Sequence, residues 1–206
     1  MHYQAKQLSC KRGRKTLFSG VSFELHKGQL LLIEGHNGAG KTSLLKLLTG
    51  LRQPDAGEIF WQSKSIYDAH SGFHSNLSWL GHQNPLKDEQ SALENLMTLS
   101  SFRPRNAMSL TEALQAVKLG HAKHAQVKTF SAGMKRRLAL ASILVADTQL
   151  WILDEPQAAL DKSGVALYES LAIKHLENNG MIVMTSHHPL NLPSERVQKL
   201  ILEGEK

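Results

Sequence analysis

The sequence predicts an α/β domain with buried parallel strands and a helical segment inserted between its two halves. Short apolar runs that end in glycine or in carboxylates alternate with longer stretches of helical period. The middle of the chain, from about residue 92 to 146, has helical period and hardly any strand signal. The chain has 206 residues, 41% of them hydrophobic, which is enough for one domain with a real core.

The first half of the chain contains a buried strand followed by a helix. Leu30 to Glu34 is a compact apolar run that ends at a glycine, which is typical of a strand buried on both faces. Thr42 to Thr49 follows with four leucines in helical spacing and stops at Gly50. We therefore expect a strand, a glycine-rich turn and a helix in this order.

The second half repeats the alternation. Trp151 to Leu153 and Met181 to Thr185 are candidate buried strands, and Lys162 to Asn178 between them is a candidate helix closed by Gly180. Strand, helix and strand in this order indicate a parallel βαβ unit. Three further helices are expected at Ala92 to Ser101, Leu110 to Leu119 and Ala132 to Ala146. We expect a mixed core sheet and one domain over residues 1–206, with a core lobe at about 1–85 and 147–206 and a helical subdomain at about 86–146.

Composition limits the partners and the compartment. No apolar run approaches the roughly 20 residues of a membrane-spanning helix, and the N-terminal residues lack the apolar region of a secretory signal. A single cysteine, Cys10, cannot form an internal disulfide, which favours a cytosolic location. The formal net charge of +6 suggests nucleic acid, a phosphate-bearing ligand or an acidic membrane surface as partner, or simply a mildly basic surface.

A phosphate-binding loop follows the first candidate strand. Residues 35–42 match G-x-x-x-x-G-K-[ST], between a strand and a helix as this motif requires. Glycines let backbone N–H groups converge on phosphate oxygens, and the helix directs its positive end at the same anions. Lys41 is expected to bridge the terminal phosphates, and the Thr42 hydroxyl to hold Mg²⁺. The candidate ATP-binding residues are Gly35, His36, Asn37, Gly38, Ala39, Gly40, Lys41, Thr42 and Ser43.

Two carboxylates supply the second half of a nucleoside triphosphatase site. Asp154 and Glu155 follow the apolar run at 150–153, at the end of a strand that should lie near the phosphate loop. Asp154 is expected in the Mg²⁺ shell, and Glu155 is expected to act as general base for the attacking water. The sequence thus predicts ATP and Mg²⁺ as cofactors.

The remaining motifs resemble those of the ATP-binding cassette (ABC) family. Residues 130–137, FSAGMKRR, are similar to the LSGGQ signature of that family. Gln83 resembles the Q-loop glutamine, Ala159-Leu160-Asp161 the D-loop, and Thr185-Ser186-His187 the H-switch. With the two phosphate-site motifs, these segments run in family order along nearly the whole chain.

The resemblance implies a head-to-tail ATPase dimer in which each signature closes on the nucleotide of the partner. Ser131 and Gly133 would contact that nucleotide, and Asp161 would link the two sites. His187 would hydrogen-bond the γ-phosphate, and Gln83 would sense Mg²⁺ and the attacking water while its loop contacts a membrane subunit. Glu155, His187 and Gln83 are thus the candidate catalytic residues, and Thr42, Asp154 and Gln83 the candidate Mg²⁺ residues.

Several positions depart from the family pattern. Phe130, Ala132 and Met134 replace the leucine, one glycine and the glutamine of the signature, and Met134 lacks an amide that could reach nucleotide. Arg12 stands where the family usually stacks an aromatic ring on adenine; a guanidinium can stack on the base, or Arg12 is simply solvated. His36 occupies a position that is often proline, and we expect it to be exposed and not catalytic.

Local details resemble one branch of the family, the ATPase subunits of haem exporters in bacterial cytochrome c maturation. The matching segments are residues 10–13, 79–83, 86–89, 92–96 and 150–156. This likeness implies integral-membrane partners similar to CcmB and CcmC, and a peripheral position on the cytoplasmic side of the inner membrane. ATP hydrolysis would drive either haem export or release of a haem-loaded chaperone.

Other readings of the sequence are the ATPase of a different ABC transporter, a soluble ABC ATPase that acts on ribosomes or DNA, and a scaffold without hydrolysis. Soluble members usually carry two cassettes or a long coiled-coil insertion, for which the chain has no room, so no nucleic-acid partner is expected. Intact Lys41, Asp154, Glu155 and His187 argue against a scaffold. His121 and His124 have helical ligand spacing but lack a cysteine or carboxylate set, which favours solvated loop histidines over a metal site.

Overall fold

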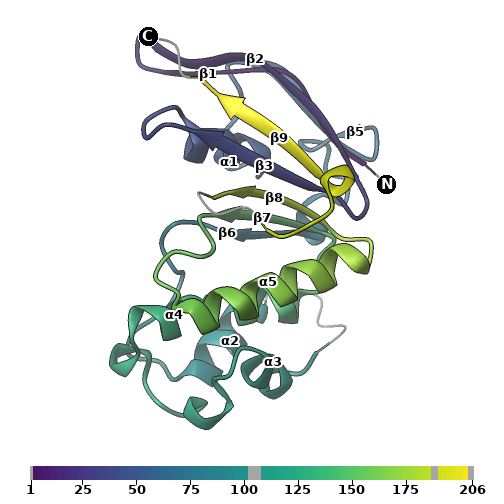
Figure 1. Cartoon of the computed structure of the whole chain (residues 1–206). Coiled ribbons are helices and arrows are strands. Elements are labelled where there is room, and N and C mark those ends of the chain that lie inside the picture. The colour runs from purple at the N-terminus through teal and green to yellow at the C-terminus, as the bar shows by residue number, and fades with distance from the viewer. Residues whose placement is uncertain (1, 102–107, 187–189, 204–206) are drawn as a thin grey trace.

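The computed structural model describes residues 2–101, 108–186 and 190–203. It consists of an outer sheet, a central sheet and a layer of helices, stacked in this order (Figure 1). The outer sheet is antiparallel, with strand order β2-β1-β4-β5. The central sheet is parallel, with strand order β6-β7-β8-β3-β9. Both expected strand directions are therefore present, but they are divided between two sheets.

The strands of the outer sheet are β1 (His2–Arg12), β2 (Lys15–His26), β4 (Ala56–Trp61) and β5 (Lys64–Ser65). Those of the central sheet are β3 (Leu30–Gly35), β6 (Leu77–Leu80), β7 (Leu150–Asp154), β8 (Met181–Thr185) and β9 (Val197–Leu202). The α-helices of the described residues are α1 (Lys41–Leu48), α2 (Ala92–Ser100), α3 (Leu110–Ala116), α4 (Ala132–Ala146) and α5 (Lys162–Glu177). Single 3₁₀ turns occupy His74–Asn76, Gly120–Ala122, Val127–Thr129 and Ser194–Arg196.

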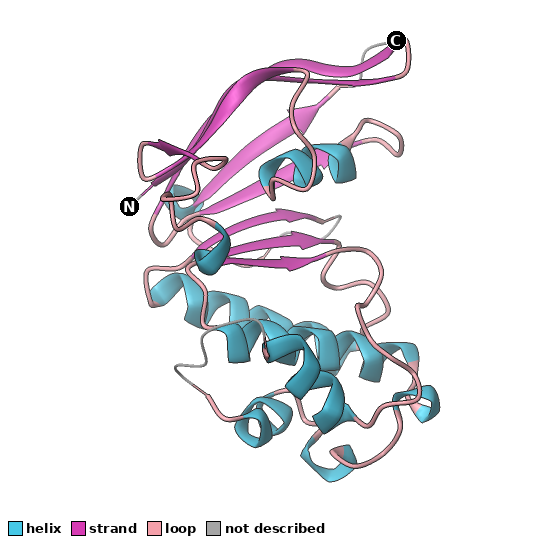
Figure 2. Cartoon of the chain, turned by 180° about the vertical axis from the view of Figure 1, so that it is seen from behind, coloured by secondary structure: helices cyan, strands magenta, loops and turns pink. Residues whose placement is uncertain are grey.

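The central sheet has a hydrophobic core on each face, which explains its uninterrupted apolar runs. In β3, Leu30 and Leu32 pack on the side of the helices, whereas Leu31 and Ile33 pack toward the outer sheet. Helix α1 lies between the two sheets, and α4 and α5 cover the other face with α2 and α3 beyond them (Figures 1 and 2). The helices of the middle segment therefore share a core with the central sheet.

The helices lie where the sequence predicts them, apart from one end. The helix expected to run to Leu119 ends at Ala116, because Lys118 adopts a left-handed conformation with φ of 59°. The Lys118 N–H donates to the Gln115 carbonyl at 2.9 Å, and the Leu119 N–H donates to the Leu114 carbonyl at 2.7 Å. These two hydrogen bonds form a Schellman motif, which is normally built on glycine. Because the residue at that position is a lysine, the sequence does not indicate that the helix ends there.

The carboxyl ends of the parallel strands gather the predicted motifs at one edge of the central sheet. In the strand register, Thr185 at the end of β8 lies between Ile33 of β3 and Asp154 of β7. The phosphate loop continues from β3, and the loop that carries Gln83 continues from β6, beside β7. In open parallel sheets this edge is where ligands bind. Within the part of the chain that the structure describes, no helix is both long and apolar enough to span a membrane.

Candidate active site

The phosphate loop has the backbone shape of an anion cradle. Gly35 has φ of 152°, and a Cβ built on it would lie 2.6 Å from the Leu202 carbonyl oxygen, so this position accepts only glycine. Gly40 precedes α1 with φ of 97°, and no side chain caps the helix. The first N–H groups of α1 are therefore left to an external acceptor, and the helix dipole favours an anion there.

Helix α1 is held firmly behind this cradle. Leu44, Leu45, Leu47 and Leu48 are all fully buried between the two sheets. Burial of four leucines fixes the direction of the helix and hence of its N-terminal N–H groups. Lys41, in the first turn, donates through Nζ to the Gly35 carbonyl at 2.6 Å and to the His36 carbonyl at 3.2 Å. Its ammonium group thus lies over the loop itself.

Two threonine hydroxyls orient the carboxylate of Asp154. Thr42 Oγ1 donates to Asp154 Oδ2 at 2.8 Å, and Thr185 Oγ1 donates to Asp154 Oδ1 at 2.7 Å. Asp154 is 4% exposed, so these bonds fix an anionic group at the edge of the core. The hydroxyl of Thr42 and the carboxylate of Asp154 are hard oxygen donors, which suit Mg²⁺.

Glu155 follows in a strained backbone conformation. Its φ is 46°, in the left-handed region that a glutamate rarely adopts. The Glu155 N–H donates to Thr185, to the hydroxyl at 3.0 Å and to the carbonyl at 3.2 Å. The carbonyl of Glu155 accepts from Arg136 at 2.8 Å. Strained residues of this kind occur at functional sites, where the surrounding contacts fix them.

These groups line one cavity of about 250 Å³. Arg12 reaches it from the end of β1, in the outer sheet. The residues that line the cavity are Arg12, Leu17, Asn37, Gly38, Gly40, Lys41, Thr42, Ser43, Asp154 and Glu155. The structure thus brings together six of the nine predicted phosphate-loop residues with Asp154, Glu155 and Arg12.

Three predicted loop residues lie outside the lining of that cavity. Ala39 is 1% exposed and packs in the core between the sheets. His36 is exposed, and its Nε2 hydrogen-bonds the Glu203 carbonyl at 3.1 Å, at the end of the β9 edge. Gly35 allows the close approach of β9 described above.

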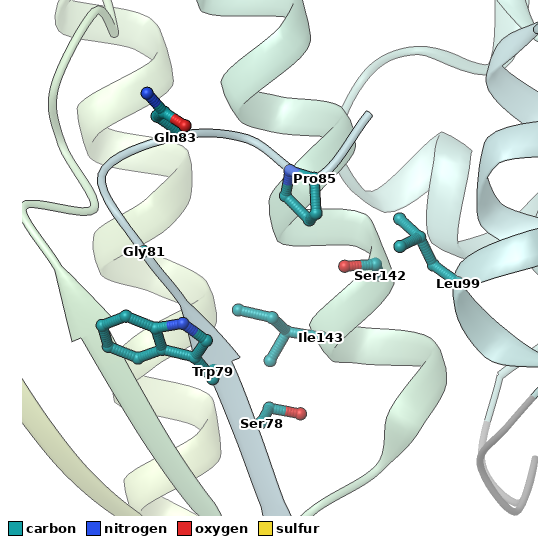
Figure 3. A pocket seen from close by; sticks show the side chains of 8 residues that line it. All are labelled: Ser78, Trp79, Gly81, Gln83, Pro85, Leu99, Ser142 and Ile143. Carbon is teal, nitrogen blue, oxygen red and sulfur yellow. The ribbon is translucent and has the colours of Figure 1, made fainter. Parts of the chain in front are cut away.

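Gln83 lies at a second cavity, of about 260 Å³, beside α4. Figure 3 shows Gln83 at the bend of its loop, Trp79 on β6, and Ser142 and Ile143 reaching toward the cavity from α4. Leu99 lines it from α2. Gln83 is exposed and does not line the phosphate cavity in this structure.

The signature and the D-loop lie against each other. Ser131 is the N-cap of α4 and accepts from the Met134 N–H at 3.2 Å. A Cβ on Gly133 would lie 3.0 Å from the Ala159 carbonyl oxygen, so the glycine permits this contact. Asp161 caps α5 by accepting from the Gly164 N–H at 2.7 Å, and this bond lowers the pKa of its carboxyl. Ser131, Gly133 and Asp161 do not line the phosphate cavity. His187 lies outside the described residues.

Arg136 is a site residue that sequence reasoning missed. It lies on α4, is 2% exposed, and donates five hydrogen bonds to the loop of Gln83 and to the end of β7. Burial lowers the pKa of Arg136 to about 10, so the group stays charged at neutral pH. In the sequence it belongs to the basic cluster Lys135 to Arg137. Its spacing of four and seven residues from the buried Leu140 and Ile143 could have revealed that it faces the core.

Comparison with known protein families decides the assignment. A family model described as ABC transporter matches residues 18–158, which include the phosphate loop, Gln83, the signature and both carboxylates. The chain belongs to the ABC transporter family. As an ABC ATPase it binds ATP, and the predicted family, fold and enzyme class are confirmed.

Two curated relatives of this ABC ATPase share a name and a degree of similarity. "Cytochrome c biogenesis ATP-binding export protein CcmA" of Escherichia coli K12 is 41% identical over 199 residues, which cover 97% of this chain and 95% of the relative. The protein of the same name from Shigella boydii serotype 4 has the same identity and coverage. The predicted resemblance to the ATPases of cytochrome c biogenesis is thereby confirmed.

Solved structures agree on the fold of this ABC ATPase. An ATP-binding subunit of an ABC transporter superimposes with a TM-score of 0.85 at 20% identity, over 98% of this chain and 86% of that one. A nucleotide-free ATP-binding cassette gives a TM-score of 0.80 at 18% identity, over 98% and 88% of the two chains.

Proposed function

We propose that this ABC ATPase is the ATP-hydrolysing subunit of a cytochrome c biogenesis exporter, and that it acts as a dimer on membrane subunits. The observation that carries the proposal is the 41% identity to CcmA over 97% of the chain, together with a cavity lined by the phosphate loop, Asp154 and Glu155. Transport of haem or release of a haem-loaded chaperone would be the work that ATP drives.

Binding of ATP would rely on the phosphate loop and α1. The uncapped N–H groups of α1 would donate hydrogen bonds to the β- and γ-phosphates, and Lys41 would exchange its two backbone carbonyls for phosphate oxygens. Arg12 lines the same cavity from β1 and would stack on adenine. These contacts supply positioning and electrostatic stabilisation, which provide most of the catalysis in phosphoryl transfer.

The donor set at Thr42 and Asp154 fits Mg²⁺. The Thr42 hydroxyl and an Asp154 oxygen lie 2.8 Å apart, and the Thr185 hydroxyl holds the other carboxylate oxygen in place. Both would hold the ion, and Gln83 would approach it when its loop moves inward. Bound Mg²⁺ would neutralise charge that develops on the phosphates.

Hydrolysis would use Glu155 as general base. Glu155 lines the phosphate cavity, and its backbone is fixed by Thr185 and Arg136. It would take a proton from the attacking water, and Gln83 and His187 would orient that water. General-base catalysis of this kind contributes about 10² to 10⁴ in rate.

A head-to-tail dimer would complete each site. Ser131 and Ala132 are exposed at the start of α4, and the partly exposed Gly133 and the exposed Asp161 lie close by. In the dimer, Ser131 and Gly133 would reach the nucleotide of the partner. Asp161 would connect the two sites through its contact with the D-loop of the second copy.

The cavity beside Gln83 would receive a cytoplasmic segment of the membrane subunits, proteins similar to CcmB and CcmC. Its lining combines exposed Gln83 and Pro85 with apolar Trp79, Leu99 and Ile143, which suits an amphipathic segment (Figure 3). Residues 86–146 would form a helical subdomain that moves against a core lobe of 1–85 and 147–206. The ATPase would then lie peripherally at the cytoplasmic face of the inner membrane, where its net charge of +6 favours an anionic leaflet.

The test is complementation in a bacterium that lacks its own CcmA. The chain is expressed in that strain, and holocytochrome c is measured by haem staining; membranes are isolated to find whether the chain co-purifies with integral-membrane subunits. Restored cytochrome c by the parent, and none by Glu155→Gln or Lys41→Ala, supports the proposal. Recovery with ribosomes or DNA, and no membrane partner, would contradict it.

A further inference from the structure

Arg136 uses its whole hydrogen-bonding capacity inside the protein. Nε donates to the Pro156 carbonyl at 3.1 Å, and the two terminal nitrogens donate to four further acceptors at 2.8 to 3.1 Å. A guanidinium has five N–H groups, so every one of them has a partner. All five acceptors are uncharged oxygens. Their arrangement therefore matches the planar geometry of the guanidinium and not only its charge.

The acceptors belong to two segments that are far apart in the sequence. Asp154, Glu155 and Pro156 offer three consecutive carbonyls at the end of β7. Gly81 offers a carbonyl and Asn84 a side-chain oxygen on either side of Gln83. One side chain on α4 thus joins the general-base segment to the loop of Gln83.

The neighbouring residue on α4 holds the far end of the same loop. Lys135 Nζ forms an ion pair with Asp88 Oδ1 at 2.7 Å. Ser131, at the start of α4, lies only a few residues before Lys135 and Arg136. A displacement of the signature end of α4 would therefore be transmitted both to the Gln83 loop and to the backbone of Glu155.

We propose that Arg136 is a positioning residue for ATP hydrolysis, which fixes the left-handed backbone of Glu155 and the Gln83 loop relative to the signature helix. The proposal rests on the roles proposed above for Glu155 and Gln83. Arg136 does not line the phosphate cavity and so acts through these two segments. A lysine cannot take its place, because an ammonium is a single point with three donors, whereas the acceptors need a planar fork.

The first experiment compares Arg136→Lys with Leu140→Ala in the full-length protein. Leu140 is 3% exposed on the same helix, and its truncation lowers stability without removing an acceptor of the Arg136 network. The melting temperature of each variant is measured first. The Kd for a fluorescent ATP analogue and the kcat for phosphate release are then measured well below both melting temperatures. We expect Arg136→Lys to lower kcat at least about tenfold with Kd within about threefold, and Leu140→Ala to keep kcat.

A kcat of Arg136→Lys equal to that of the parent would overturn the proposal, and so would an equal loss of kcat in Leu140→Ala at matched melting temperature. The parent and Glu155→Gln proteins are measured in parallel. If Glu155→Gln hydrolyses ATP at the parent rate, the role of Glu155 fails, independently of what Arg136→Lys does.

Asn84→Ala tests the link to the loop, and this single variant does so even if Arg136→Lys folds poorly; a double-mutant cycle with Arg136→Lys then measures the coupling. Asn84→Ala removes the one side-chain acceptor of Arg136 and leaves the other four hydrogen bonds. We expect it to lower kcat by about threefold in the parent and to have little further effect in Arg136→Lys, because residues in one network are not additive. An unchanged kcat in Asn84→Ala, or full additivity in the cycle, would overturn the link to the Gln83 loop.

Discussion

The Thr42 hydroxyl donates to an Asp154 carboxylate oxygen at 2.8 Å and so joins the phosphate loop to the end of β7. These two segments leave strands that are not neighbours, because β8 lies between β3 and β7. Thr185 at the end of β8 completes the connection by donating to the other oxygen of Asp154. The carboxylate is therefore oriented from two elements, the first turn of α1 and the end of β8.

Thr42→Ala should raise the Mg²⁺ concentration for half-maximal ATP hydrolysis by about tenfold, which corresponds to about 1.4 kcal/mol. The change removes a donor oxygen and releases Asp154 from one of its two hydroxyl partners. Phosphate release is titrated with Mg²⁺ at saturating ATP. Thr42→Ser is the matched control, since it keeps the hydroxyl and should retain most of the parent affinity. Equal Mg²⁺ dependence in Thr42→Ala and parent would exclude Thr42 as a ligand.

Ser131→Ala and Ser91→Ala should each lower stability by about 1 kcal/mol, because each serine caps a helix. Only Ser131 lies in the surface proposed to face the partner nucleotide. Ser131→Ala should therefore also reduce the ATP-dependent dimer, measured by light scattering in a Glu155→Gln background, whereas Ser91→Ala should not. If both variants lose the dimer equally, the signature role of Ser131 is wrong and its effect is that of a helix cap.

Met134→Gln should increase the ATP-dependent dimer and lower the ATP concentration needed to form it. Met134 is half-buried in the first turn of α4, and a glutamine there could hydrogen-bond nucleotide of the partner copy. The gain of one such bond is on the order of 1 kcal/mol, or a several-fold shift in the midpoint. Met134→Leu serves as control, because it keeps an apolar side chain of similar volume. No difference between the two variants would argue that position 134 does not reach nucleotide.

His175 should make the protein less stable below neutral pH. Burial lowers the pKa of His175 to about 4, and the ring stacks on Trp151 with centroids 3.9 Å apart. The unfolded chain takes up the proton near pH 6.5, so stability is constant above that pH and falls as the pH drops toward 4, by at most about 3 kcal/mol.

Urea unfolding at pH 7.5 and pH 5 measures this contribution of His175. His175→Phe keeps an aromatic ring against Trp151 but cannot be protonated, so its stability should change less between the two pH values. The variant also loses the hydrogen bond from His175 to the Met181 carbonyl. That loss lowers its stability at both pH values, so the change between the two pH values is the quantity compared. An identical pH dependence in parent and variant would contradict the buried, neutral state of His175.

The parts of the fold that the sequence predicts are those with local signals. The strand Met181–Thr185 and the helix Ala132–Ala146 have the predicted bounds, since each combines an unbroken apolar pattern with a clear terminus. The outer sheet was not predicted, because a bulge shifts the alternation of β1 by one residue. Tyr3 and Ala5 face the core before Gln7, which has φ of 50°, and Leu8 and Cys10 face it afterwards.

For the candidate site, the phosphate loop and the carboxylate pair are predicted because each lies directly after a recognisable strand. Leu17, which lines the same cavity from β2, has no such signal. The network around Arg136 has no such signal. Its acceptors are backbone carbonyls, which any residue supplies, and Gly81 is far from Arg136 in the sequence. Only the arrangement of β6 beside β7 brings them within reach of α4.

The strand order of the central sheet also determines when the ATP site can form during synthesis. Leu30 of β3 pairs with Ile182 on one side and with Val197 on the other. On a translating ribosome, the strand that leads into the phosphate loop therefore emerges long before either of its neighbours exists, and contacts of such long range form slowly. ATP can therefore stabilise the phosphate loop only after β8 and β9 have been synthesised, and the apolar faces of β3 must be protected until then.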